Sequence, residues 1–280
     1  MVGRNIEYTI ISVKLGILLL FSLWHSAVLG QYLLKNSLVE GNAESMNGEV
    51  SRFREVILIP EYVSDGLKEL YTTGIRKPQI IPNMVSILFV VSALDDETKD
   101  LALRNRSNML TSYFDFMNHF GDKEYMVGGA LALQLGGILL NDPKKRMISN
   151  ELLTSFGIGS LITHSIKRSL GRTRPYATDD PYRFLGPNKQ VFRQYSLPSG
   201  HSTIAFAAAT VLAERTESKY LRWLYYGVAA STSLARIYKN KHWLSDVVGG
   251  ATIGYFSAKL VIRVSDKIQL RIYGYPLFQE

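Results

Sequence analysis

Apolar runs bounded by charged residues recur along this chain of 280 residues. Three long runs cover residues 78–94, 125–140 and 152–166, and three shorter runs cover residues 202–213, 223–235 and 247–258. Each long run has the length of a helix. Strand signals are scarce, because few segments alternate β-branched and polar residues. The pattern predicts a mostly α protein that folds as a single helical bundle.

The length of the apolar runs bears on whether they cross a membrane. A spanning helix needs about 20 mostly apolar residues, whereas runs of about 10 to 14 usually belong to buried helices. Most of the runs fall short, which favours a water-soluble or peripheral bundle. The 17 uncharged residues from Pro78 to Leu94 reach the lower limit of about 17 for a span. An integral multi-span membrane protein is therefore the alternative.

The N-terminus resembles an export signal. Arg4 and Lys14 precede an uncharged run over residues 15–34, and small residues follow its most apolar part. This arrangement predicts a signal peptide over residues 1–30 with cleavage near Gly30, or an N-terminal anchor, and either one exports the rest of the chain. Residues 31–75 read as a polar lead-in, and residues 76–280 as the helical domain.

Charge and cysteine content narrow the function only slightly. The formal net charge is +8, and the basic residues are spread along the chain instead of forming one stripe. Nucleic acid is therefore not expected as a partner. An anionic substrate or a membrane surface fits the same excess of positive charge. Cysteine is absent, which excludes disulfides and thiolate metal sites.

The first cluster of candidate chemistry is "KRSLGRTRP", residues 167–175. Gly171 and Pro175 are expected to end the preceding helix, which brings Lys167 and Arg174 close to one helix end. Cations at such an end also simply complement the helix dipole, and for this cluster alone that structural role is the simpler interpretation.

The second cluster is "PSGH", residues 198–201, in front of an Ala-rich run. Ser199 is a natural N-cap, and the free N–H groups of Gly200 and the next residues form an anion site. His201 lies in the first turn, where the positive helix end should lower its pKa unless an anion is bound. An ordinary capped helix explains the cluster equally well.

The third cluster is "ARIYKNKHWLSD", residues 235–246. If a helix begins near Lys241, His242 and Asp246 share one face, and the carboxylate accepts a hydrogen bond from one ring nitrogen. The other nitrogen is then a nucleophile. On an unremarkable helix the same pair is only a surface contact. Arg236 adds a third cation.

Together the three clusters supply what phosphoryl transfer through a phosphohistidine needs, without a metal. Three separated motifs, Lys-x6-Arg-Pro, Pro-Ser-Gly-His and Arg-x5-His-x3-Asp, occur in order between about Ser165 and Ile253. This pattern resembles the type 2 phosphatidic acid phosphatase superfamily, which includes bacterial acid phosphatases and vanadium haloperoxidases. The resemblance implies the all-helical fold of that group and no cofactor.

The resemblance also implies a role for each matching residue. His242 would attack phosphorus, Asp246 would orient it, and His201 would protonate the leaving oxygen. The residues expected to bind phosphate are Lys167, Arg174, Ser199, Gly200 and Arg236. One position departs from the family, because Ala235 stands where a serine is common before the arginine, and this departure puts the packing around Arg236 in question.

The resulting hypothesis is an exported phosphatase acting on phosphomonoesters or diphosphates, with lipid-linked substrates preferred. The alternatives are a vanadate-dependent haloperoxidase and a non-catalytic phospholipid-binding bundle. Other polar residues are interpreted as structural: His25, His119 and His164 as incidental, and the acids Asp95, Asp96, Glu97, Asp179 and Asp180 as helix caps and solvated surface. Residues 176–196 are expected to form a loop over the mouth of the site.

Overall fold

The structure is a computed structural model that describes residues 79–187, 195–273 and 278. The chain divides into two units after Ser64, and every described residue belongs to the second, Asp65–Glu280. The predicted signal or anchor at residues 1–30 and the lead-in at residues 31–75 lie outside the described residues, so their boundaries stay predictions.

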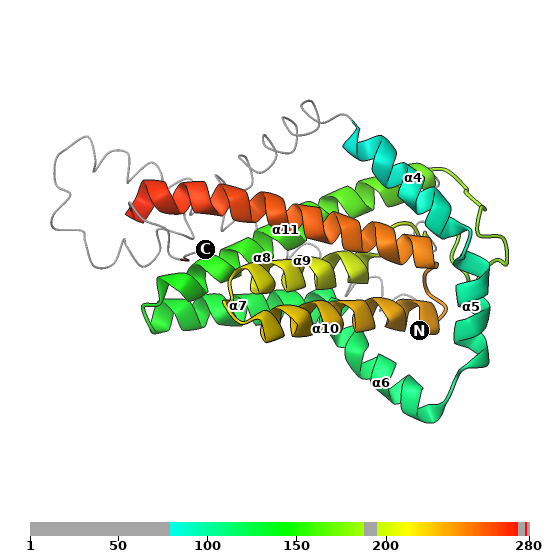
Figure 1. The fold of residues 1–280 in the computed structure, drawn as a ribbon, viewed down its shortest axis with the longest axis horizontal. Helices are drawn as coiled ribbons and strands as arrows, with labels where there is room; N and C mark the ends of the chain where they lie inside the picture. The colour runs from blue at the N-terminus through cyan, green and yellow to red at the C-terminus, as the bar shows by residue number, and fades with distance from the viewer. Residues whose placement is uncertain (1–78, 188–194, 274–277, 279–280) are drawn as a thin grey trace, which may run out of the picture. The chain divides into compact units, whose positions relative to one another are not determined.

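Helices account for almost all the regular structure in the described part, which confirms the predicted mostly α class (Figure 1). The elements are α4 (Ile80–Ser92), α5 (Asp95–Arg104), α6 (Asn108–Asn118), the 3-10 helix η1 (His119–Gly121), α7 (Lys123–Leu139), α8 (Pro143–Leu170), α9 (Gly200–Glu214), α10 (Lys219–Tyr238) and α11 (Leu244–Tyr273). Each of the six predicted apolar runs lies largely or wholly within a helix. The hydrophobic pattern gave no signal for α5 and α6, whose residues are of mixed polarity.

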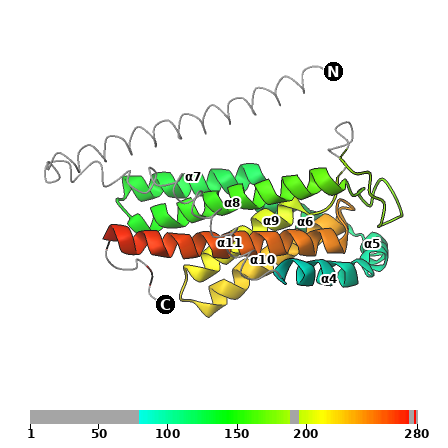
Figure 2. The same cartoon turned by 90° about the horizontal axis from the view of Figure 1, so that it is seen from above.

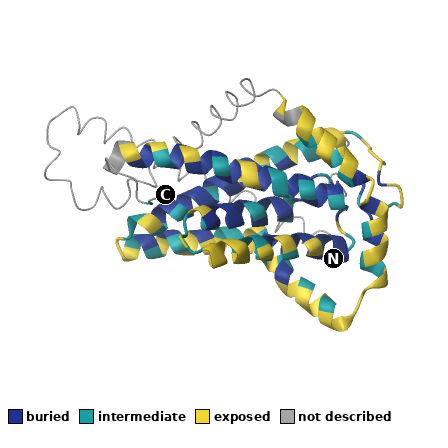
Figure 3. Ribbon diagram, viewed as in Figure 1, coloured by how far each residue is buried: buried dark blue, intermediate teal, exposed yellow. Residues whose placement is uncertain are grey.

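Helix α9 is the centre of the bundle, with α8, α10 and α11 packed around it (Figures 1 and 2). Its alanines Ala207 and Ala208 are buried against Leu152 and Phe156 of α8 and against Ala258 of α11. Small side chains allow neighbouring helices to approach closely, which explains why a helix with so few large residues forms the core. Figure 3 shows the burial concentrated on α9 and on the faces turned toward it.

Helix α11 extends well beyond its predicted apolar run because the charged residues of its second half lie away from the core. Arg263 and Lys267 are exposed, whereas Val261 and Ile268 on the opposite side are buried. Within the described residues, Leu244–Leu270 is the one stretch long and apolar enough to cross a membrane by length and composition, and 61% of its most apolar window is buried inside the bundle.

Close packing at Gly250 sets the distance between the start of α11 and the start of α9. A Cβ atom at this position would lie 2.3 Å from the carbonyl oxygen of Ser199. Only glycine allows so close an approach of two backbones. The packing therefore brings the residues before α11 next to the N-terminus of α9.

Helix α8 ends where the sequence predicted. Gly171 is the C-cap with φ of 63°, and a Cβ there would lie 2.2 Å from the carbonyl oxygen of Gly186. The end of α8, the start of α9, the end of α10 and the start of α11 thus lie at the same end of the bundle, next to α5 (Figures 1 and 2).

Candidate active site

The structure brings the three predicted clusters together at this end of the bundle. Lys167 lies in the last turn of α8, and Arg174 lies in the loop that follows. His201 lies in the first turn of α9, and Arg236 in the last turn of α10. His242 precedes α11 by two residues. Their mutual electrostatic influence, described below, follows from this convergence.

Two of the cations are tied to the short segment before Ser199. The Nζ atom of Lys167 donates to the carbonyl oxygens of Tyr195 (3.2 Å) and Ser196 (2.7 Å). The Nε atom of Arg174 donates to the same Tyr195 carbonyl at 3.2 Å. Backbone carbonyls orient both side chains without neutralising their charge.

The positive charge of the site is not compensated. Among the described residues, no carboxylate forms an ion pair with Lys167, Arg174 or Arg236. Burial, followed by repulsion from the two arginines, lowers the pKa of Lys167 to about 7 despite attraction from Asp246. Burial and then Arg174 lower the pKa of Arg236 to about 10. Such charges attract an anion strongly.

Arg236 also retains an unused donor. Its buried Nε has no hydrogen-bond partner among the described residues, whereas one terminal nitrogen donates to Oδ1 of Asn118 at 2.5 Å. A buried polar group without a partner is costly unless a ligand satisfies it. The guanidinium is therefore held by Asn118 with a donor left for an oxyanion.

The N-terminus of α9 completes the anion site. Ser199 is the N-cap, as predicted, and its Oγ accepts from the N–H of Ser202 at 3.4 Å. Gly200 and His201 occupy the first two helical positions, whose N–H groups have no carbonyl one turn earlier. Backbone donors at a helix N-terminus are well suited to phosphate oxygens.

His201 is neutral in this environment. Burial is the main cause that lowers its pKa to about 3, with Arg236 second and a partial offset from Asp122. The sequence predicted the direction of this shift from the helix end alone. Burial and a neighbouring guanidinium are the causes that the structure identifies.

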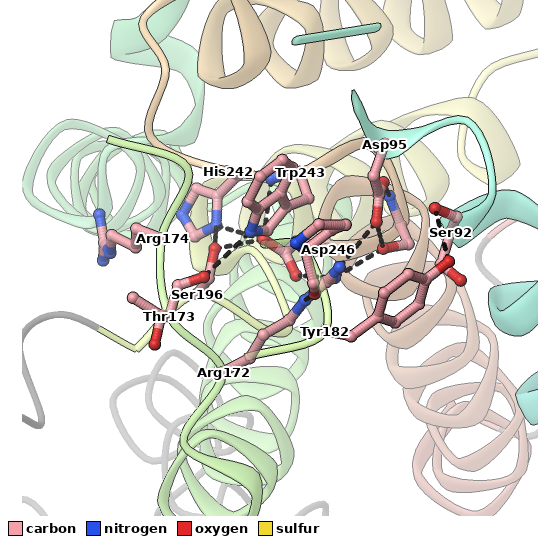
Figure 4. Close-up of polar contacts among 12 residues, drawn as sticks. Ser92, Asp95, Arg172, Thr173, Arg174, Tyr182, Ser196, His242, Trp243 and Asp246 are labelled. Carbon is pink, nitrogen blue, oxygen red and sulfur yellow. Dashed lines mark hydrogen bonds and ion pairs between the residues drawn. The ribbon is translucent and has the colours of Figure 1, made fainter. Parts of the chain in front are cut away.

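The predicted direct hydrogen bond between His242 and Asp246 is not present. Helix α11 begins at Leu244 instead of near Lys241, and Nδ1 of His242 lies 3.5 Å from Oδ2 of Asp246. The hydroxyl of Ser196 lies between them, 3.3 Å from Nδ1 and hydrogen-bonded to Oδ2 (Figure 4). Asp246 instead accepts from the backbone N–H of Trp243 at 2.9 Å.

This geometry fixes the imidazole tautomer through Ser196. Because the serine hydroxyl donates to Asp246, its oxygen accepts a hydrogen bond from Nδ1–H of His242. Nε2 then carries the free lone pair. Burial first, and then the positive charge of Lys167, hold the pKa of His242 well below its ordinary value, so the ring is a neutral nucleophile.

The interpretation of Asp95 as a solvated cap is wrong. Asp95 does lie in the first turn of α5, but it is only 1% exposed and forms an ion pair with Arg172 at 2.7 Å. Arg172 also contacts Asp246 at 2.8 Å (Figure 4). Burial of the acid depends on an arginine 77 positions later, which a local pattern does not reveal. Asp96 and Glu97 are exposed, as expected.

Sequence reasoning missed four residues at this site: Ser196, Arg172, Asn118 and Asp122. Arg172 stands inside the first motif and Ser196 two residues before the second, so proximity to the motifs was a usable signal. Asn118 and Asp122 flank η1 in a region without motifs, and their role depends on η1 packing against α9 and α10.

A cavity of about 170 Å³ adjoins His201 between the first turn of α7, the middle of α8 and the start of α9. His164, set aside as incidental, lines this cavity together with Ser160 and Thr163.

The loop of residues 176–187 is anchored to α5, because Lys99 donates to the carbonyl of Thr178 at 3.3 Å. Residues 188–194 lie outside the described part. Within the part of the chain that the structure describes, no group of three or more His, Asp or Glu side chains could hold a metal.

Fold and site together define a class: an all-α bundle with a cationic oxyanion pocket served by two neutral histidines. Residues 149–270 match the PAP2 superfamily. The matched region is less than half of the chain, and it contains all three motifs and excludes α4 to α7.

Two relatives are named for phosphatase activities. A lipid A 1-phosphatase from Porphyromonas gingivalis is 33% identical over 132 residues, which are 46% of this chain and 26% of the relative. An undecaprenyl-diphosphatase from Sulfolobus acidocaldarius is 27% identical over 160 residues, 57% of this chain and 73% of the relative. The match thus spans about a quarter of the first relative and about three quarters of the second.

A solved structure shares the fold. The transmembrane PAP2 type phosphatidylglycerolphosphate phosphatase from Bacillus subtilis superimposes with a TM-score of 0.51 over 66% of this chain and 96% of that chain, at 20% identity. This likeness supports the helical arrangement and says nothing of the substrate.

Proposed function

We propose that this protein is a metal-independent phosphatase that hydrolyses phosphomonoesters or diphosphates through a phosphohistidine. The observation that carries the proposal is the juxtaposition of three uncompensated cations with the buried imidazole of His242, whose Nδ1 faces the hydroxyl of Ser196. Cations attract the phosphate, and the neutral ring supplies the nucleophile.

The first half-reaction transfers the phosphoryl group to the enzyme. Nε2 of His242 attacks phosphorus, the bond to the leaving oxygen breaks, and that oxygen takes a proton from His201. In the second half-reaction water attacks the phosphohistidine, gives a proton to His201 and releases phosphate. The two histidines thus divide the roles of nucleophile and acid or base.

Lys167, Arg174 and Arg236 bind the phosphate oxygens and stabilise the five-coordinate transition state. Arginine makes paired contacts with phosphate, whereas lysine acts as a point charge. The N–H of Gly200 and the hydroxyl of Ser199 supply further donors.

The acid role of His201 requires bound substrate. In the empty site its pKa is about 3, because burial and Arg236 oppose the charged ring. A bound phosphate dianion offsets the positive charge of Arg236, which raises the pKa of His201 and lets it carry the proton that the leaving oxygen needs.

We propose a lipid-linked phosphate as the substrate. The relatives described above are named for lipid A and undecaprenyl diphosphate, and the outer helices expose many large apolar side chains. Figure 3 shows α4 and α6 as largely exposed. The exposed apolar side chains include Val85, Phe89, Val90, Met109, Phe116, Leu131, Leu135, Leu139, Tyr220, Trp223 and Leu224. Extended apolar surface of this kind suits contact with lipid.

We propose further that the protein works at the extracytoplasmic face of a membrane. The uncharged N-terminal run over residues 15–34 supports export. N-terminal sequencing of the mature protein tests cleavage near Gly30, and carbonate extraction separates a peripheral from an integral protein. Recovery of the full chain in the cytosol would contradict the placement.

Phosphate release from phosphatidate, a polyprenyl diphosphate, a phosphorylated lipid A and a sugar phosphate tests the activity. We expect release from at least one lipid substrate without added metal, and its loss in His242→Ala. Bromination with added vanadate and no hydrolysis of any substrate would favour a haloperoxidase instead. Persistence of hydrolysis in His242→Ala at the parent rate would exclude His242 as the nucleophile.

A further inference from the structure

Helix α5 lies outside the matched region, yet one of its side chains reaches the catalytic carboxylate through an arginine. We propose that Asp95 and Arg172 are positioning residues that hold Asp246, and through Ser196 also His242, in the geometry for attack. This inference rests on the proposed function for its kinetic consequences and on the contacts below for its geometry.

Arg172 uses all of its nitrogens within the protein. One terminal nitrogen donates to Asp246 (2.8 Å) and to the hydroxyl of Ser245 (2.6 Å). The other donates to Asp95 (2.7 Å), and Nε donates to the carbonyl of Pro181 (2.8 Å). The side chain is only 3% exposed, so this guanidinium cannot be a phosphate ligand and acts through its neighbours.

Asp95 fixes the first turn of α11. Its Oδ1 accepts from the backbone N–H of Ser245 (2.8 Å), and its Oδ2 accepts from the hydroxyl of Ser245 (2.7 Å) as well as from Arg172. Asp95 therefore holds the residue before Asp246 and the arginine that binds Asp246. Figure 4 shows Arg172 reaching to both carboxylates.

Both oxygens of Asp246 are occupied as a result. Oδ1 accepts from Arg172, and Oδ2 accepts from the N–H of Trp243 and from Ser196. A carboxylate that is hydrogen-bonded through both oxygens is held in one orientation. Its hydrogen bond to Ser196 in turn fixes the hydroxyl that orients the ring of His242.

The charge of the triad matters as well as its geometry. Arg172 alone would cancel the charge of Asp246, whereas with Asp95 the three groups carry a net charge of about −1 when the acids are ionised. A net negative charge behind Ser196 stabilises the positive charge that develops on His242 when Nε2 attacks phosphorus.

The pKa of His242 depends on every charged group around its ring. These are Lys167 from α8, Arg172 and Arg174 from the loop after α8, His201 from α9, Arg236 from α10, Asp246 from α11, and Asp95 and Lys99 from α5, where Lys99 lies 5.2 Å from the Trp243 ring. Removal of a cation raises the pKa of His242, and removal of an anion lowers it.

Two variants with opposite expected shifts test the proposal. The acid limb of kcat reports the deprotonation of His242. Arg172→Met should move it to higher pH, and Asp95→Asn should move it to lower pH, each by about half a unit or more. We expect kcat to fall by about 10-fold to 100-fold in both variants, with little change in KM because the phosphate cations are untouched.

The chain offers a matched control at the opposite end of α9. Glu151 is fully buried and paired with Arg215 at 2.6 Å. Glu151→Gln therefore removes a buried carboxylate from an arginine as Asp95→Asn does, but far from the site. The control should lower stability without shifting the pH profile. Identical profiles in Asp95→Asn, Arg172→Met and Glu151→Gln would reduce Asp95 and Arg172 to a structural role.

Arg172→Lys separates charge from geometry and serves if Arg172→Met fails to fold. Lysine keeps the charge but cannot bridge two carboxylates with separate nitrogens. We expect the acid limb to stay at the parent pH while kcat recovers only in part. A fully active lysine variant would overturn the positioning role.

Anion binding keeps the test independent of turnover. Vanadate accepts an imidazole nitrogen as a fifth ligand, whereas sulfate remains tetrahedral and needs only the cations. Arg172→Met should weaken vanadate binding by about 10-fold or more and leave sulfate binding unchanged. If the parent protein hydrolyses nothing, the proposed function fails, but the comparison of vanadate and sulfate binding still tests whether Asp95 and Arg172 position His242. Equal weakening of vanadate and sulfate binding in Arg172→Met would contradict the positioning role.

Discussion

The bundle contains two clusters in which one arginine lies between two carboxylates. At the site end, Arg172 joins Asp95 to Asp246. At the other end of α9, Arg215 binds both oxygens of Glu151, at 2.9 and 2.6 Å, and contacts Asp266 at 2.7 Å. The two arginines are about equally buried and fully paired. They differ in what adjoins them, since of these two only Arg172 contacts a carboxylate linked to His242, the proposed nucleophile.

The three cations proposed to bind phosphate show the opposite behaviour. Among the residues that the structure describes, Lys167, Arg174 and Arg236 hydrogen-bond only to backbone carbonyls and an amide oxygen. Burial is the main cause that lowers their pKa values. At Arg215, burial is outweighed by Glu151, and the pKa is raised. Compensated charge therefore holds neighbouring groups in place, whereas uncompensated charge supports the proposed site for an anionic ligand.

The distant cluster should give the largest effect on stability. Arg215→Met leaves Glu151 buried without its partner, which costs about 3–5 kcal/mol in the free energy of unfolding. Chemical denaturation measures this loss, and kcat of the fraction that stays folded should equal that of the parent. A drop in kcat of the folded enzyme without loss of stability would show that the two ends are coupled.

The serine between His242 and Asp246 should have the largest effect on turnover after the nucleophile itself. Ser196→Ala removes the link that holds the ring tautomer, so kcat should fall by about 10-fold to 100-fold with KM nearly unchanged. Steady-state kinetics check this split. Ser265→Ala, a change at a buried serine near the Arg215 cluster, should leave kcat unchanged. Parent-like kcat in Ser196→Ala would mean that Asp246 orients the ring directly.

The sequence predicted most of the helices but not all of the contacts at the site. Apolar runs located α4 and α7 to α11, because each of these helices contains a long stretch without charged residues. The runs were too short at their ends, since Arg263 and Lys267 of α11 are exposed on a helix that remains buried on its other side. Helices α5 and α6 were missed because their polarity is mixed.

Spacing rules identified the residues inside each motif but not the contacts between motifs. Gly171 and Ser199 were recognised because caps depend on local geometry. The burial of Asp95 and the place of Ser196 depend on partners 77 and 50 residues away, and no local pattern encodes such distances. The expected direct bond between His242 and Asp246 failed for the same reason, because the serine comes from another segment.

The lowered pKa of Lys167 predicts how anion affinity varies with pH. Below about pH 7 the buried ammonium is charged and binds an anion directly. Above that pH the empty site has lost the proton, and binding must restore it, so sulfate affinity should fall by up to about tenfold per pH unit. Sulfate stays a dianion throughout, and isothermal titration calorimetry measures both affinity and proton uptake.

Lys167→Arg is the control for this prediction. Arginine stays charged across the range, so the decrease in sulfate affinity above pH 7 should largely disappear. An unchanged slope in this variant would assign the proton to another group, such as His201.

The smallest expected effect comes from a substitution that gives Arg236 a carboxylate partner, as Arg215 has. Asn118→Asp places a carboxylate where an amide oxygen now accepts from Arg236 at 2.5 Å. The new pair should raise the free energy of unfolding, because it compensates a buried charge. The same pair competes with the ligand and should weaken sulfate binding by about tenfold. Asn118→Ala removes the hydrogen bond without adding charge, so it should weaken sulfate binding by only about threefold. If the aspartate variant gained stability and kept its sulfate affinity, Arg236 would not be an anion ligand.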